Sequence, residues 1–205
     1  MAYQVRRTAA DEWRRLREIR LEALKDTPIG FGERYDTAIA RPDSYWRERA
    51  ERDASSHSTA KFVAVDEADG ALVGTIGVFP ASRQRTGESS RPDGRVNEHE
   101  YILYAVYVSP AHRGARLGVA TLLFDHAVAW ARDTAGAQSI TLSVHERNHR
   151  AHAFYRRYGF VETGVTMPYA LDPSAKQIWM RLERDTAPDQ QARSADLIDM
   201  PDQHA

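Results

Sequence analysis

The segment VSPAHRGARLGVA, residues 108–120, runs from an apolar strand through a Pro and an Arg-Gly pair into the start of a helix. The first N–H groups of a helix have no partner within the helix, and that end carries a positive partial charge, so phosphates bind there readily. Gly114 and Gly118 let the backbone turn tightly and approach a ligand, and Arg113 and Arg116 add positive charge. The segment suits a phosphate site, although a plain turn that reverses the chain fits these residues equally well.

Two common phosphate-binding motifs do not fit this corner. The P-loop ends in Gly-Lys-Ser or Gly-Lys-Thr, and RGARLG contains neither. The dinucleotide fingerprint needs three glycines spaced as G-x-G-x-x-G after the first strand of a doubly wound sheet. Here the glycines are four residues apart, and the strand before them comes late in the chain, after an expected hairpin. A phosphate site at this corner would therefore be of another type.

Hydrophobic periodicity around the corner predicts an α/β domain. Residues 101–108 are apolar at nearly every position, which is typical of a strand covered on both faces. A strand, a helix and a second strand within about forty residues imply a crossover between parallel strands. The expected strands are residues 3–7, a hairpin over 61–79 with its turn at Asp69-Gly70, and residues 101–108, 138–144, 160–167 and 176–183. The first expected helix follows a capping box at Thr8–Asp11 and ends at Lys25. Further helices are expected to begin at Pro42 and to cover 117–131 and 150–158.

Two polar segments interrupt this pattern. Residues 81–100 form a long polar connection, and such loops are usually functional or disordered. We interpret this one as mobile surface, with a substrate lid as the alternative. After Asp185 the sequence becomes polar and rich in aspartate, which indicates a flexible tail. We therefore expect one domain over residues 1–184 and a C-terminal tail over 185–205.

The composition excludes several classes of protein. The chain has 205 residues, a formal net charge of −1, 42% hydrophobic and 28% charged residues, and no cysteine. Near-neutral charge argues against a nucleic-acid partner, and no apolar run approaches the ~18–20 residues of a membrane helix. The N-terminus lacks the apolar stretch of a signal peptide, so we expect a cytoplasmic protein. Without cysteine, neither a thiolate metal site nor an acyl-cysteine intermediate can form.

A second segment, LSVHERNHRAHAFYRRYGF at residues 142–160, gives the corner its context. Together the two segments resemble the GNAT superfamily of acyl-CoA-dependent N-acetyltransferases. In that family R/Q-x-x-G-x-G/A opens the helix that grips the pyrophosphate of coenzyme A, and N-x-x-A-x-x-F-Y-x-x-x-G-F completes the site. The first pattern fits at Arg113 and Gly118, with Arg116 where Gly is preferred. The second pattern matches fully, at Asn148, Ala151, Phe154, Tyr155, Gly159 and Phe160.

The resemblance implies a GNAT-like α/β fold: a central mixed, mostly antiparallel sheet of six to seven strands, flanked by helices, with one splayed parallel strand pair. It implies acetyl-CoA as the cosubstrate and no metal. The pyrophosphate would lie on the N–H groups of the corner, and the pantetheine arm would enter between the splayed strands and pair with one strand edge, much as an added β-strand does. The residues expected to bind coenzyme A are Val106, Tyr107, Val108, Arg113, Gly114, Ala115, Arg116, Leu117, Gly118, Val119, Asn148, Ala151, Phe154 and Tyr155.

Tyr155 is the candidate for the catalytic acid. When an amine attacks the thioester, coenzyme A leaves as a thiolate, and a phenol can donate a proton to the departing sulfur. The plainer alternative is that Tyr155 belongs to the inner apolar stripe of its helix. Family members often use a Glu on the central strand as the base, but the interior ILYAVYV contains no carboxylate. We rank Glu100, at the start of that strand, first as the base and His145 second.

The letters H-E-R-N-H at residues 145–149 also reproduce the zinc motif HExxH. That motif needs both histidines on one helix face. We expect His145 to follow a strand and Asn148 to cap the next helix, so we predict no metal site. The two functions that remain are an N-acetyltransferase acting by direct attack in a ternary complex and, as the alternative, a non-catalytic acyl-CoA-binding regulatory module.

The sequence does not name the amine acceptor. We expect a small molecule or a peptide, with no nucleic-acid or membrane partner, and we leave a homodimer open. The acceptor pocket would be built from residues 24–46, the 81–100 loop and the region 165–175. Aromatic residues in these segments would contact an apolar or cationic acceptor, or belong to the core; they are Phe31, Tyr35, Tyr45, Trp46 and Tyr169.

Overall fold

The computed structural model describes residues 2–83 and 99–182, which form one seven-stranded sheet in the order β1-β2-β3-β4-β5-β7-β6. All neighbours are antiparallel except β4 and β5, which are parallel. This confirms the expected mixed, mostly antiparallel sheet with one parallel pair. The strands are β1 (Tyr3–Arg7), β2 (Ala60–Asp66), β3 (Leu72–Pro80), β4 (Glu100–Val108), β5 (Ser139–His145), β6 (Phe160–Tyr169) and β7 (Asp172–Leu182).

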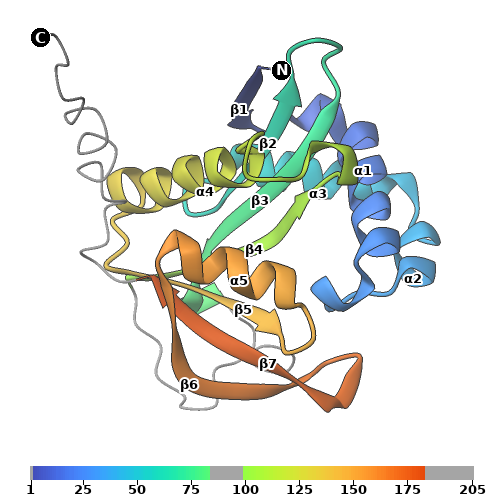
Figure 1. Ribbon diagram of the computed structural model, residues 1–205. Helices are drawn as coiled ribbons and strands as arrows, with labels where there is room; N and C mark the ends of the chain where they lie inside the picture. The colour runs from blue at the N-terminus through green and yellow to red at the C-terminus, as the bar shows by residue number, and fades with distance from the viewer. Residues whose placement is uncertain (1, 84–98, 183–205) are drawn as a thin grey trace, which may run out of the picture.

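Helices cover both faces of the sheet (Figure 1). On one face, α4 (Val119–Ala129) and α5 (His149–Tyr158) enclose a core centred on Phe124. On the other face, α1 (Trp13–Asp26), α2 (Tyr35–Ile39) and α3 (Asp43–Ser55) enclose a second core that includes Trp13 and Trp46. The sheet is therefore buried on both sides, which explains why its central strands are apolar at nearly every position.

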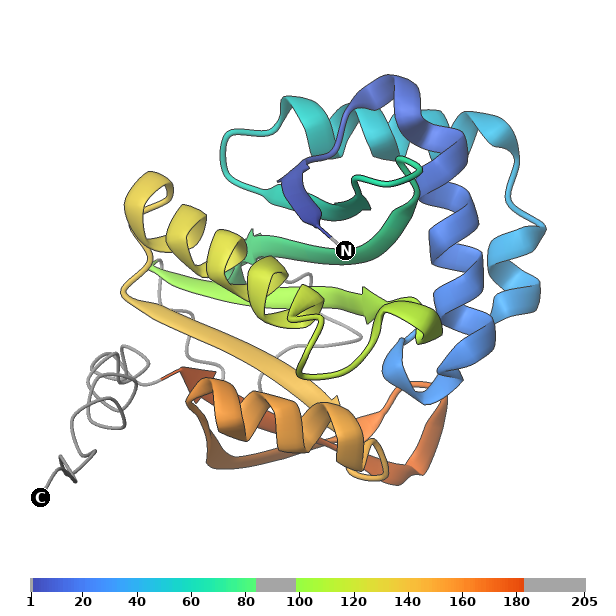
Figure 2. The same cartoon turned by 45° about the horizontal axis from the view of Figure 1, so that its top comes forward.

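The parallel seam between β4 and β5 is short. Only Glu100, Tyr101 and Ile102 pair with β5, opposite Ser139 to Thr141. Figure 2 shows β4 and β5 starting together and diverging toward the corner at residues 108–118. The splayed parallel pair expected from the sequence is thus present, and it leaves the facing edges of β4 and β5 unpaired with each other beyond Ile102.

A β-bulge in β4 lies where the strand leaves β5. Thr75 of β3 pairs with Tyr107 of β4, and Gly77 of β3 pairs with Tyr104. Between these two pairs, β3 therefore spans two residue steps and β4 spans three. Ala105 lies within this bulge, and its φ of 50° is in the left-handed region. The Thr75 hydroxyl donates to the Ala105 carbonyl at 2.8 Å and holds the bulge. Because a bulge bends its strand, it helps to turn β4 away from β5.

The start of the first helix differs from the sequence prediction. The Thr8 hydroxyl has no hydrogen-bond partner within the described residues, so Thr8 and Asp11 do not form the predicted capping box. A 3₁₀ turn at Ala10–Glu12 precedes α1 instead, and the Glu12 carboxylate accepts from the Ala9 N–H at 3.3 Å while pairing with Arg6. Because Glu12 pairs with Arg6 of β1, Glu12 and not Asp11 is the acid that caps the start of this turn.

Other differences are small or lie beyond the description. Pro42 caps α3 rather than standing inside it, and the short helix α2 was not predicted. The predicted tail 185–205 and most of the predicted loop 81–100 lie outside the described residues. Within the described part of the chain, no helix combines the length and apolar character needed to cross a membrane.

Candidate functional site

A cavity of about 1380 Å³ opens where β4 and β5 diverge. On the α4–α5 side its lining includes the corner glycines and α5, and on the other side it reaches α1 and α3. The cavity therefore passes through the sheet and connects the two faces. Ligand sites are commonly concave and of this size or smaller, which makes the gap between the strands the candidate site.

The corner before α4 has the backbone geometry of an anion site. Gly114 and Gly118 have φ values of 118° and 66°, which favour glycine, and Gly118 is the N-cap residue of α4. Both glycines and Ala115 line the cavity. The N–H groups of the first turn of an eleven-residue helix have no intrahelical partner, and they lie beside this wall. Leu117 and Val119 instead pack toward the core and do not line the cavity.

Arg113 holds the corner in place with its side chain. Its Nε donates to the Val108 carbonyl at 2.7 Å, and its guanidinium pairs with Asp26 at the end of α1. It also lies 5.4 Å from the centre of the Tyr107 ring. The hydrogen bond from Arg113 lowers the pKa of the Asp26 carboxyl. The charge of Arg113 is therefore compensated within the protein, and its backbone rather than its guanidinium is available to a ligand.

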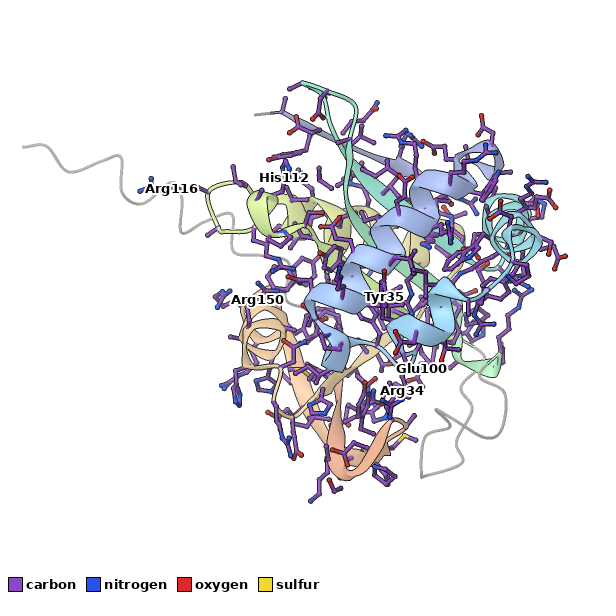
Figure 3. The ribbon with its side chains drawn as sticks, turned by 90° about the vertical axis from the view of Figure 1, so that its right-hand side faces the viewer. Arg34, Tyr35, Glu100, His112, Arg116 and Arg150 are labelled. Carbon is purple, nitrogen blue, oxygen red and sulfur yellow. The ribbon has the colours of Figure 1, made fainter. Side chains whose placement is uncertain are left out.

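Two other arginines flank the opening of the cavity. Figure 3 shows Arg116, from the loop before α4, and Arg150, from α5, on the same side of the molecule. Both are exposed, but only Arg150 lines the cavity. The sequence analysis did not select Arg150. The sequence could have indicated Arg150, because it lies between the matched motif positions Asn148 and Ala151 at the start of α5.

The edge of β4 forms one wall of the gap. Val106, Tyr107 and Val108 all line the cavity beyond the last residue that pairs with β5. Opposite them, Asn148 caps α5: its Oδ1 accepts from the Ala151 N–H at 3.2 Å, so the capping role considered from the sequence is present. The amide nitrogen of Asn148 remains able to donate into the cavity, which Asn148, Ala151 and Phe154 also line.

Tyr155 is buried, with 7% of its surface exposed, and lines the same cavity. Its ring packs against Phe124, Phe154 and Phe160 at centroid distances of 5.6–6.1 Å. Burial raises the pKa of the Tyr155 phenol. No hydrogen bond from its hydroxyl is formed within the described residues. The ring is therefore structural, while the neutral hydroxyl keeps a proton that it can donate.

The two candidate bases lie in different places. Glu100 is buried at the closed end of the seam, where its Oε1 accepts from Thr141 at 2.9 Å, and it does not line the cavity. His145 ends β5 and does line it. The Nδ1 of His145 accepts the Arg147 N–H at 3.1 Å, so a neutral ring carries its proton on Nε2. Burial lowers the pKa of His145, which favours this neutral form.

The H-E-R-N-H letters do not make a helical metal motif. His145 belongs to β5, whereas His149 is the first residue of α5. The Arg147 N–H already occupies Nδ1 of His145. The described residues contain no group of three or more acidic, histidine or cysteine side chains able to hold a metal ion.

Comparison with known proteins identifies the family. The model of the acetyltransferase (GNAT) family matches residues 13–160. This protein belongs to the GNAT family. The resemblance read from residues 108–120 and 142–160 is therefore confirmed, since both segments lie within the matched range.

Individual relatives agree with this result. The chain is 31% identical over 101 residues to the Drosophila melanogaster protein "Probable N-acetyltransferase san", which covers 48% of this chain and 53% of that protein. The chain thus matches about half the length of that curated relative. A GNAT-family acetyltransferase from Streptococcus pneumoniae has a TM-score of 0.69 at 19% identity over 88% of this chain and 98% of its own. A GCN5-related N-acetyltransferase from Kribbella flavida has a TM-score of 0.62 at 25% identity over 88% and 96%.

The far end of the cavity in this GNAT protein contains residues that the sequence analysis missed. Arg20 from α1, Arg49 from α3 and Tyr104 from β4 line it, with Phe31 from the predicted acceptor segment. Trp46, by contrast, is 3% exposed and belongs to the core. The residues that were missed are Arg20 and Arg49, which come from two helices distant in sequence, so no local motif could have indicated them.

Proposed function

We propose that this GNAT protein transfers the acetyl group of acetyl-CoA to an amine by direct attack within a ternary complex. The observation that carries the proposal is the single cavity that joins the glycine corner, Tyr155 and the α1–α3 side of the sheet. A cosubstrate entering at the corner and an acceptor entering from the opposite face would meet between β4 and β5. The absence of cysteine from the chain supports direct attack over an acyl-cysteine intermediate.

The corner would bind the cosubstrate. The N–H groups of Leu117 and Gly118 donate to the Gly114 carbonyl, but those of Ala115, Arg116 and Val119 form no hydrogen bond within the described residues. These groups are suited to the pyrophosphate, and Arg116 and Arg150 add positive charge beside it. The pantetheine amides would pair with the edge of β4 between Val106 and Val108. The side-chain amide of Asn148 would donate to the same arm.

Tyr155 would act on the leaving group. The amine nitrogen bonds to the thioester carbon, the carbon–sulfur bond breaks, and the sulfur takes a proton from the phenol. Burial raises the pKa of Tyr155 above its ordinary value, so a lasting tyrosinate is disfavoured. Tyr155 would therefore recover a proton, through water, from the attacking nitrogen, which becomes strongly acidic once bonded to the acyl carbon. The net products are one amide and one thiol.

The acceptor must reach the site with its lone pair free. For an alkylamine with a pKa near 10.4, losing the proton at neutral pH costs about 4–5 kcal/mol. His145 is the better located of the two proposed bases, because it lines the cavity. It would accept a proton only by giving up the hydrogen bond from Arg147, a net cost of about 1 kcal/mol. Glu100 would need a chain of water molecules to act.

Two measurements test the proposal. Calorimetric titration with coenzyme A should give one site per chain, and Arg150→Glu should weaken it while Arg156→Glu, an exposed change on the same helix, should not. Thiol release from acetyl-CoA should then be measured with a panel of primary amines. Binding of coenzyme A without thiol release for any amine would contradict the enzyme and favour the regulatory acyl-CoA-binding module.

A further inference from the structure

The acceptor end of the cavity is built around arginines. Arg20 and Arg49, from α1 and α3, both line it and are partly buried. Opposite them, Tyr104 of β4 lies over Gly77 of β3, where any side chain would overlap its ring. Lys61 of β2 pairs with Gly77 on its other side, so Lys61, Gly77 and Tyr104 lie in one row across the sheet. Lys61 is 5% exposed. Three cationic side chains therefore share one partly enclosed face of the sheet.

Only part of this charge is compensated. The Glu33 carboxylate accepts from Arg20 at 2.9 Å and also from Arg41 at 3.1 Å, so one negative charge serves two arginines. The side chain of Arg20 also stacks on Phe31 at 4.5 Å. This group of side chains keeps a net positive charge, although the position of Arg20 is well fixed.

Arg49 forms no ion pair within the described residues, although the carboxylates of Asp53 and Glu33 lie close enough to help raise its pKa. Its one hydrogen bond within the described residues goes to the neutral Tyr45 hydroxyl, at 3.4 Å. A guanidinium has five N–H donors, so most of those of Arg49 are free to meet a ligand in the cavity. Burial opposes the charge of Arg49, and no described carboxylate comes within ion-pair distance of its guanidinium. The neighbourhood of Arg49 therefore favours an anion.

The pKa of Lys61 reflects the same local positive charge. Burial, and next the charge of Arg49, lower the pKa of Lys61 to about 7. Asp53 opposes this shift, and Arg20 adds to it. Lys61 forms no ion pair within the part of the chain that is described. An anion bound at Arg49 would offset the positive charge that Asp53 and Glu33 compensate only in part.

Three aromatic rings of the predicted acceptor segment already lie next to a cation of the protein itself. Arg20 covers Phe31, Arg41 lies 4.2 Å from the centre of the Tyr45 ring, and Lys25 lies 5.8 Å from that of Tyr35. The protein's own cations thus occupy the ring faces that would attract a foreign one. A cationic acceptor is disfavoured at these three rings for that reason, whereas Tyr104 and Phe79, which line the cavity, pack against each other and carry no cation of the described residues.

We propose that the amine acceptor carries a carboxylate, and that Arg49, assisted by Arg20, binds this group while the amine faces the thioester. The proposal rests on the proposed function and specifies its substrate class. The planar guanidinium of Arg49 would form paired hydrogen bonds with the carboxylate. The carboxylate is unchanged by the reaction, so Arg49 selects and orients the acceptor and takes no part in bond making.

The test compares each amine with a version that lacks only the charge. Glycine, β-alanine and 4-aminobutanoate are measured beside their carboxamides, and the dipeptide amide Met-Glu beside Met-Gln. In the free amino acids, the amide lowers the basicity of the amine, so intrinsic reactivity favours the carboxamide. We expect kcat/KM to be roughly 10- to 100-fold higher for the carboxylate at the best chain length, the strength of a charge-assisted pair. A preference among the free amino acids would identify the acceptor as an amino acid, and a preference among the dipeptide amides would identify it as a peptide.

Three variants assign the preference to Arg49. Arg49→Gln should reduce it to under about threefold, and Arg49→Lys should retain part of it because the charge remains without the planar fork. Arg47→Gln, on the exposed side of the same helix and outside the cavity, should leave the preference intact. The affinity for coenzyme A, measured by calorimetry, should be the same in all of them. Folding is checked by melting temperature, and Arg49→Lys carries the test if Arg49→Gln does not fold.

The two proposals fail in different ways. Thiol release without any preference for a carboxylate would overturn the inference and leave the acetyltransferase in place. An equal loss of preference in Arg47→Gln and Arg49→Gln would overturn it as well. Absence of thiol release for every amine would overturn the proposed function, and the inference with it. As a readout independent of turnover, the best carboxylate should bind the complex with coenzyme A in wild type and not in Arg49→Gln.

Discussion

In the two proposals, the two ends of the cavity bind negative charge by different means. At the corner before α4, the positive potential comes from backbone N–H groups that two glycines expose. At the acceptor end it comes from Arg20 and Arg49, which project from separate helices. A backbone site is insensitive to most side-chain changes and to pH, whereas a side-chain site is sensitive to both. The comparison suggests that the cosubstrate end is a fixed feature and the acceptor end an adjustable one.

The largest expected effect lies between the two ends. Tyr155→Phe should lower kcat by about 100-fold, within the usual contribution of a general acid. It should leave coenzyme A affinity and melting temperature nearly unchanged, because the hydroxyl makes no hydrogen bond within the described residues. Tyr158→Phe, on the same helix as Tyr155, is the control: it removes the hydrogen bond to Asp125 of α4 and should change kcat little. Equal kcat in wild type and Tyr155→Phe would remove Tyr155 as the acid.

The next effect belongs to the corner. Arg150→Glu should weaken acetyl-CoA binding by about tenfold, and the loss should shrink as salt is added because the site is exposed. Titration calorimetry at two salt concentrations measures this. Gly118→Val is a poorer probe, since a branched side chain at a φ of 66° would strain the turn itself. An unchanged affinity in Arg150→Glu would mean that the backbone alone carries the cosubstrate end.

A third prediction concerns pH and applies to the acceptor end. A carboxylate bound at Arg49 would raise the pKa of Lys61, so Lys61 would take up a proton on binding at pH values above about 7. Affinity for a carboxylate without an amine, such as butanoate, should therefore be highest below pH 7 and fall a few-fold as pH rises. The groups around Lys61 are Arg20, Arg49, Asp53 and Tyr104, whose phenol has a pKa raised by burial to about 12. Lys61→Met should remove the dependence, and coenzyme A affinity should stay flat above pH 7.

The smallest effects concern the proposed bases. Glu100→Gln should change kcat by less than about threefold, since Glu100 does not line the cavity. His145→Gln keeps a side-chain donor near the Nε2 position but removes the basic nitrogen, so it and His145→Ala should each lower kcat by about tenfold. A loss of about 100-fold in Glu100→Gln would show that a water chain links this carboxylate to the acceptor.

The features of the proposed cosubstrate end that the sequence predicted are local in the chain. Residues 108–120 and 142–160 contain the turn, the cap and Tyr155, because a strand-to-helix corner and a helix cap are determined by neighbouring residues. The parallel seam followed from the strand–helix–strand order. At the acceptor end Phe31 belongs to a predicted segment, but Arg20 and Arg49 were not predicted, because they become neighbours only through packing. In the sequence, Arg49 is one of several arginines on α3 and nothing distinguishes it from Arg47.

The short seam between β4 and β5 has a mechanical consequence. Only three residues of β4 pair with β5, so two antiparallel halves of the sheet are joined along a narrow hinge. A pantetheine arm lying in the gap would act as a removable extra strand that ties the halves together. Each cycle of binding and release would then stiffen and loosen the sheet, and hydrogen exchange along β4 and β5 should slow when coenzyme A is added.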